Sequence, residues 1–147
     1  MTTKNNRFSF KSIVSIAFII CVSIFLQSCA KKITFGTSSI VPAAQGSIKV
    51  KKDKNNNYNI DLNVIHLAEP TRLSPARQLY IVWMETEANG TKNIGQLKTS
   101  SGLLSKTLKS SLKTVSSFKP TRIFITAEDD ANIQYPGNQI VLSTDNF

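Results

Sequence analysis

The chain has 147 residues, of which 18 are Lys or Arg and 9 are Asp or Glu, so its formal net charge is +9. Its 2 cysteines, Cys21 and Cys29, both lie near the N-terminus, and there is 1 histidine. This composition excludes a zinc site of the usual Cys/His kind and a Cys/His catalytic pair, because no Cys-x-x-Cys pair and no second histidine is present.

The N-terminal segment has the pattern of an export signal. Three basic residues precede an uncharged apolar run from Ser12 to Leu26, and a small residue, Ser28, stands immediately before Cys29. The run has the length of a secretory apolar region and is shorter than the roughly 20 residues that cross a bilayer. We therefore expect a cleaved signal peptide over residues 1–28, and an uncleaved signal anchor is the alternative.

The sequence Leu26-Gln27-Ser28-Cys29 resembles the lipobox of bacterial lipoproteins, with Gln27 in place of the small or apolar residue usual there. The resemblance implies that the Cys29 thiol is lipidated, that the chain is cut before Cys29, and that acyl chains such as palmitate anchor the protein. Two or three acyl chains hold a protein stably, whereas one does so only marginally. We expect Cys29 to be the lipid-attachment residue of an envelope lipoprotein whose mature domain lies outside the cytoplasm, in the periplasm.

Removal of residues 1–28 leaves 147 minus 28, or 119 residues, which is enough for one domain with a single core. The signal carries 3 of the 18 basic residues and no acidic one, so the mature chain has a net charge of 15 minus 9, or +6. A basic chain suggests a nucleic-acid partner. An exported lipoprotein, however, meets anionic lipid, cell-envelope polymer or an acidic protein first, so we expect no nucleic-acid partner.

Residues 29–45 have no sustained apolar period and many small polar side chains, which predicts a lipidated tether before a domain over residues 46–147. From Gly46 onward, short stretches alternate apolar and polar residues, as antiparallel strands do. Expected strands cover residues 47–51, 58–64, 79–85, 92–98, 103–109, 121–128 and 139–143. Polar turns separate them, including Asn89-Gly90, where we expect a type I′ hairpin turn.

Residues 101–118 allow two interpretations. Leu104, Leu108, Leu112 and Val115 are spaced by four, four and three residues, which suits a helix, but the high content of serine and threonine disfavours one. We favour a strand over 103–109 followed by a loose turn. Seven strands at these intervals predict an all-β, antiparallel, immunoglobulin-like β-sandwich, with a small mixed barrel as the alternative.

Several short motifs resemble those of one family. They are Gly46-Ser47-Ile48, Tyr80-Ile81-Val82-Trp83, Ile94-Gly95-Gln96-Leu97, the stretch 123–128 and the stretch 136–142. Over about residues 44–143 the order of these motifs resembles the extracytoplasmic C-terminal domain of anti-sigma-K factors. The resemblance implies an immunoglobulin-like sandwich and, as an alternative function, an envelope regulatory or sensory module.

The resemblance does not extend to sigma-factor inhibition. Asp129-Asp130-Ala131-Asn132 stands where the family usually has Glu-Pro-x-Gly-Gly, and we identify neither a cytoplasmic sigma-binding domain nor a membrane helix that would follow it. A lipid anchor cannot carry a signal across the inner membrane. We therefore expect a free-standing outer domain.

No motif predicts catalysis or a cofactor, because no serine lies in a supported Gly-x-Ser-x-Gly or Ser-x-x-Lys context and no glycine-rich phosphate loop occurs.

Three weaker candidate sites have simpler explanations. His66 could be a base or a ligand, but a packed or solvated histidine is favoured. Glu85 and Glu87 could form a carboxylate pair, but a solvated strand end is favoured. Glu128, Asp129, Asp130 and Asn132 could hold Ca²⁺, but a solvated acidic turn is favoured.

Lysines give the remaining candidate site. Lys49, Lys51, Lys52 and Lys54 are candidates for contact with an anionic surface, and Lys98, Lys106, Lys109 and Lys113 are expected to join them on one side of the sandwich. A solvated face is the alternative. The sequence thus predicts a membrane-anchored envelope lipoprotein, not an enzyme, whose β-sandwich binds an envelope protein or an anionic polymer, or has a structural role.

Overall fold

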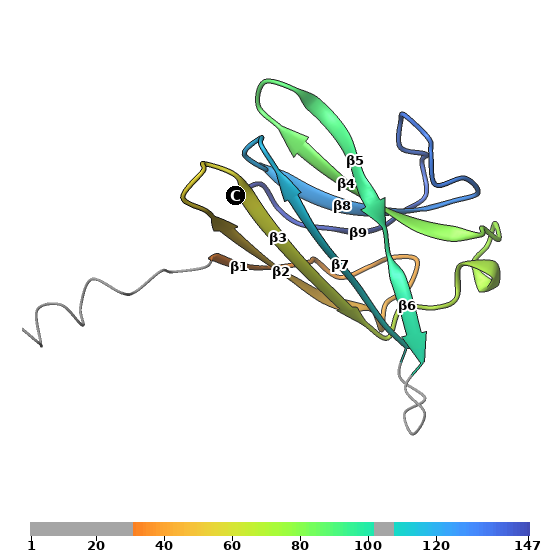
Figure 1. The fold of residues 1–147 in the computed structure, drawn as a ribbon. Helices are drawn as coiled ribbons and strands as arrows, with labels where there is room; N and C mark the ends of the chain where they lie inside the picture. The colour runs from red at the N-terminus through yellow and green to blue at the C-terminus, as the bar shows by residue number, and fades with distance from the viewer. Residues whose placement is uncertain (1–30, 102–107) are drawn as a thin grey trace, which may run out of the picture.

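Nine strands and one short 3-10 helix form in the part of the chain that the computed structural model describes, residues 31–101 and 108–147 (Figure 1). In chain order they are β1 Lys31–Thr34, β2 Gln45–Lys52, β3 Tyr58–Ile65, η1 Pro70–Arg72, β4 Leu79–Thr86, β5 Gly90–Gln96, β6 Lys98–Ser101, β7 Leu108–Ser116, β8 Arg122–Glu128 and β9 Ile140–Ser143. The segments that alternate apolar and polar residues are thus strands, and the predicted all-β class is confirmed.

The strands form two antiparallel sheets that lie face to face (Figure 1). The five-stranded sheet has the order β1-β2-β3-β7-β6, and the four-stranded sheet has the order β5-β4-β8-β9. Without β1 and β5, these orders match the two sheets of an immunoglobulin constant domain. The predicted antiparallel sandwich is therefore confirmed, and the mixed barrel is excluded for the described residues, since their strands form two separate sheets.

The core between the sheets follows from the period of two in each strand. Inward-facing residues of β3, β4 and β8 alternate with outward-facing ones, so that each strand contributes one side chain in two to the interface. The largest buried side chains there include Ile48, Ile60, Leu62, Val64, Val82, Met84, Ile123 and Ile125. No disulfide is needed to explain this arrangement, because apolar packing spans both sheets.

Strand β4 is buried on both faces, as its unbroken apolar run predicts. Ile81 and Trp83 point away from the inter-sheet core and pack with Phe124 on the outer face of the four-stranded sheet. Ala131 and Ile133, from the β8–β9 connection, cover them. In immunoglobulin domains the tryptophan of the corresponding strand faces the inter-sheet core, so this chain uses its tryptophan differently.

The expected tether is wrong for residues 31–45. Lys31–Thr34 pairs with β2 as an edge strand, Val41 and Ala44 are buried in the core, and Gly36 N donates to Ser143 O at 2.9 Å. The apolar contacts of this segment come from single residues at irregular intervals, which is why the sequence shows no period. Residues 31–45 are therefore part of the folded domain.

The loose turn expected after residue 109 is wrong, because a strand runs from Leu108 to Ser116 and pairs with β3 along eight residues. The helical interpretation is excluded for the same residues. Residues 102–107 lie outside the described part of the chain. One inward position of β7 holds the buried polar residue Ser110, which hides the alternation of apolar and polar residues.

Two connections differ in detail from the sequence-based expectation. The β4–β5 connection has three residues, 87–89, and only Gly90 after it has a positive φ, of 64°, so it is not a two-residue type I′ turn. The predicted 92–98 strand is β5 up to Gln96, after which Leu97 is buried and the chain joins the other sheet as β6. A β-bulge in β5 shifts the register opposite Val82 and Trp83, so that Val82 pairs with Gly95 and Trp83 with Asn93.

Candidate functional site

The outer face of the five-stranded sheet carries lysines from four of its strands, β1, β2, β6 and β7. Side chains that share one face of neighbouring strands follow from the register, because paired residues point the same way. On this face lie exposed Lys32, Lys49, Lys51, Lys98, Lys109 and Lys113, which we call the lysine face. They come from segments up to 81 residues apart, from 32 to 113, and only the sheet brings them together.

One row of the lysine face crosses four adjacent strands. Lys32 pairs with Lys49, Lys49 with Asp61, and Asp61 with Lys113. At about 4.8 Å between strands, the row is about 14 Å wide. Lys113 Nζ lies 3.7 Å from Asp61 Oδ2, and both side chains are exposed, at 81% and 38%. Such a pair is weak, so Asp61 offsets little of the positive charge.

Asp61 is the only acidic residue among the described strand residues of this face. The neighbouring positions are uncharged, and they include Gln45, Ser47, Asn59, Asn63 and Ser111. Six lysines therefore stand against one aspartate on a continuous polar surface. The net charge of this face, 6 minus 1, is +5, a large part of the basicity of the whole chain.

Of the four lysines that the sequence predicts to contact an anionic surface, two lie on the lysine face. Lys49 and Lys51 lie on the lysine face, but Lys52 has the opposite parity, and its Nζ lies 5.9 Å from the centre of the Tyr58 ring. Lys54 lies in the β2–β3 turn. Lys52 therefore does not share the face of Lys49 and Lys51, because adjacent strand residues point to opposite sides. Contact of the four lysines with an anionic surface stays a prediction.

Other lysines reach the face from distant segments. Lys98, Lys109 and Lys113 join it as predicted, and Lys32, which had been assigned to the tether, joins it through β1. Lys106 and Cys29 lie outside the described residues. The alternation of Lys49 with buried Ile48 was the signal for this face, but its full extent required the strand order.

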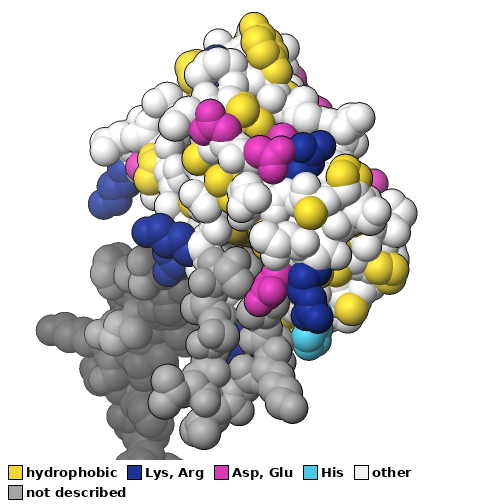
Figure 2. All heavy atoms as spheres, turned by 90° about the vertical axis from the view of Figure 1, so that its right-hand side faces the viewer, with side chains coloured by type: hydrophobic (Ala, Val, Ile, Leu, Met, Phe, Trp, Pro, Cys, Tyr) yellow, Lys and Arg dark blue, Asp and Glu magenta, His cyan; other side chains and the backbone are white. Residues whose placement is uncertain are grey.

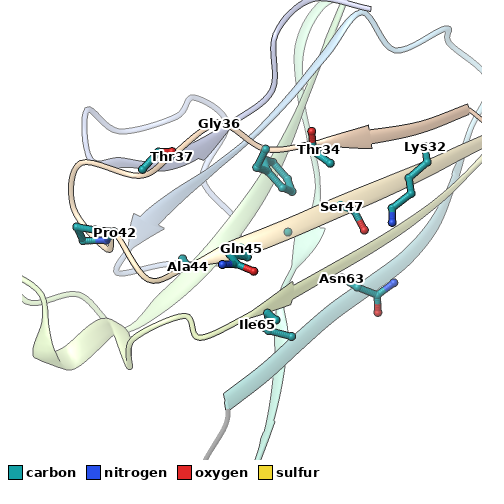
Figure 3. Close-up of a pocket in the computed structure, with 12 residues that line it drawn as sticks. Lys32, Thr34, Gly36, Thr37, Pro42, Ala44, Gln45, Ser47, Asn63 and Ile65 are labelled. Atoms are coloured by element: carbon teal, nitrogen blue, oxygen red, sulfur yellow. The ribbon is translucent and has the colours of Figure 1, made fainter.

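A shallow hollow of about 550 Å³ opens on the lysine face beside Lys32 (Figure 3). Its rim includes Thr34, Gln45, Ser47 and Asn63, which are side chains that can form hydrogen bonds, and Phe35 and Ile65 add apolar surface. Figure 3 shows Thr34 on β1, Gln45 and Ser47 on β2, and Asn63 and Ile65 on β3, and Phe35 directly follows β1. The hollow is thus a polar depression in a basic surface.

His66 and Glu85 have local structural roles. His66 follows the last residue of β3 with a positive φ of 58° and is exposed, which confirms the predicted strand end at this point. Glu85 accepts a hydrogen bond from Arg122 Nη1 at 3.1 Å, while Glu87 lies beyond the end of β4. Glu85 is thus held in an ion pair with Arg122.

The acidic group after β8 is divided among separate contacts. Glu128 is buried and accepts a hydrogen bond from Gly137 N at 2.8 Å, Asp129 pairs with Arg77, and Asp130 accepts from Asn132 N at 2.9 Å. Within residues 31–101 and 108–147, no group of three His, Cys, Asp or Glu side chains could hold a metal ion. These carboxylates therefore organise the β8–β9 connection.

Charge is distributed differently on the end of the sandwich that Figure 2 shows. There, acidic and basic side chains lie next to one another and neither sign gathers into a patch. Arg77 and Asp129 form an ion pair of opposite charges between the β3–β4 and β8–β9 connections. The lysine face thus differs from this end by having almost one sign of charge.

Comparison with protein-family models, with curated proteins and with solved structures gives no match for this chain. The resemblance to the outer domain of anti-sigma-K factors therefore stays a prediction from the sequence. In the described ranges, no helix is long and apolar enough to cross a membrane.

Proposed function

We propose that the protein is a lipid-anchored envelope lipoprotein whose β-sandwich is a noncatalytic module that binds an anionic surface. The lysine face carries this proposal, because six lysines against one aspartate on a rigid sheet form a preorganised cationic surface. The anchor is Cys29, at the end of a lipobox-like sequence. The folded domain displays the face outside the cytoplasm.

The anchor is tested by substitution of Cys29. We expect that Cys29→Ser incorporates no labelled palmitate and keeps its signal peptide, because the thiol that receives the diacylglyceryl group is absent. Cells fed labelled palmitate and analysed by gel and by membrane fractionation give the answer. Cys21→Ser is the matched control and should be labelled and cut normally. Normal labelling and cutting of Cys29→Ser would contradict the anchor.

A second candidate is an envelope regulatory module. The immunoglobulin-like strand order supports it, since the resemblance to anti-sigma-K outer domains implies that order. This support concerns the fold alone. Crosslinking in native membranes separates the candidates: a regulatory module is recovered with one specific receptor or regulator, and a surface-binding module is not.

A further inference from the structure

We propose that the lysine face lies flat against the anionic lipid headgroups of the membrane that holds the Cys29 anchor. This inference rests on the proposed lipid anchor. It adds an orientation: the five-stranded sheet faces the bilayer, and the four-stranded sheet faces away from it.

The chain between the anchor and the lysine face is short. Lys32 is three residues after Cys29 and already lies in β1, paired with Lys49. Consecutive Cα atoms are 3.8 Å apart, so the Cα of Lys32 lies at most about 11 Å from that of Cys29. The domain therefore cannot move far from the headgroups, and the edge of the sheet nearest to them is the β1 edge.

The lysine face has the charge that an anionic headgroup layer attracts. Electrostatic attraction to such a layer falls off within about 8 Å at physiological ionic strength, so only a face held close to it contributes. The short connection keeps the β1 edge of this face close to the headgroups, and rotation of the domain about this edge brings the lysines of the other strands to them. Each lysine near the surface changes the orientation equilibrium by roughly fivefold, and the six lysines act together because the anchor has already removed the cost of approach.

The lysine face suits the headgroup layer and not the hydrocarbon below it. Its side chains are mostly Lys, Asn, Ser and Gln, and Val115, 60% exposed, is its one large exposed apolar side chain among the described residues. The hollow beside Lys32 adds hydrogen-bonding groups at the headgroup level. The opposite side of the molecule carries the β8–β9 connection, with Tyr135 84% exposed.

The orientation is measured with a fluorophore on either side of the sandwich. In the full-length, lipidated protein, Ser111→Cys places a label within the lysine face, and Tyr135→Cys places one on the β8–β9 connection. The protein is reconstituted into vesicles of zwitterionic lipid with and without phosphatidylglycerol, and the vesicles carry a quencher on some headgroups. With phosphatidylglycerol, we expect several-fold stronger quenching at position 111 than at position 135. The difference should disappear at about 1 M salt, where the screening length is about 3 Å.

Charge variants identify the groups responsible. Replacing Lys32, Lys49 and Lys51 with glutamine should lower the ratio of the two orientations by about a hundredfold and abolish the difference in quenching. The control replaces three exposed basic residues outside the lysine face, Arg72, Lys92 and Lys119, with glutamine and should keep the difference. The emission of buried Trp83 verifies that each variant is folded.

The outcomes separate this inference from the proposed function. Protein that does not float with the vesicles contradicts the lipid anchor itself. Protein that floats but shows equal quenching at both positions, or stronger quenching at position 135, overturns the orientation alone. Equal quenching together with protection of position 111 by added polyglutamate would assign the lysine face to a polymer and would also overturn the proposal.

Discussion

Tyr80 joins the core to the β3–β4 connection. Its buried environment makes the free energy of unfolding depend on pH. The side chain is 2% exposed and its hydroxyl donates to Ala68 O at 2.9 Å. Burial raises the pKa of Tyr80 from 10.0 to about 12. The folded protein therefore holds the phenolic proton more tightly than the unfolded chain, and the corresponding stability is complete below pH 10.

This stability should be lost as the pH rises from 10 to about 12. Over that range the free energy of unfolding should fall by up to about 1.4 kcal/mol per pH unit through this group. Tyr80→Phe removes this slope and, near neutral pH, costs about 1 kcal/mol through the lost hydrogen bond. Urea unfolding followed by Trp83 fluorescence at several pH values measures both effects. Parallel pH profiles for the two proteins would show that burial of Tyr80 does not act this way.

At the scale of elements, the packing of residues 35–46 decides whether this segment belongs to the domain. A Cβ on Gly46 would lie 2.7 Å from Phe35 Cδ2 and 3.0 Å from Val64 Cγ2. Gly46→Ala must therefore displace Phe35 and should lower the free energy of unfolding by about 1–3 kcal/mol.

Gly36→Ala is the matched control, since its Cβ would meet only Ser143 O, at 3.6 Å. It should change the free energy of unfolding by less than about 0.5 kcal/mol. Chemical unfolding of both variants gives the comparison. Equal stability of Gly46→Ala and Gly36→Ala would mean that Phe35 does not pack on β2 in solution.

The strands differ in how well the sequence predicted them. Strands β3 and β4 were found nearly to the residue, because β3 alternates strictly and β4 combines an apolar run with β-branched and aromatic residues. The sequence did not predict strand β1 or the part of strand β7 after residue 109. β1 has four residues, and β7 has buried Ser110 at an inward position, so the position of each depends on pairing with a neighbour.

At the scale of the whole molecule, the candidate site was only partly predictable. The alternation of Lys49 and Lys51 with Ile48 and Val50 indicated a basic outer face on one strand. Which other lysines share that face depends on strand order and register, which local sequence does not contain. Lys52 and Lys54 were included by proximity in sequence, and Lys32 was left out because its segment has no period.

The Cys29 anchor and the lysine face together determine how the whole molecule is oriented in the proposed function. The sheet whose outer face carries six lysines begins, at β1, two residues after Cys29. If Cys29 is lipidated, the membrane is the nearest anionic surface to this sheet. If it is not, the lysine face is displayed without a fixed orientation. The chemical state of the N-terminus therefore determines whether the lysine face has a fixed orientation at the membrane.

That state is measured most directly by mass spectrometry of the N-terminal peptide of the protein purified from native membranes. We expect a peptide that begins at Cys29 and carries a diacylglyceryl group on its sulfur, with residues 1–28 absent. A peptide that contains residues 1–28, or one with an unmodified Cys29 thiol, would contradict the account.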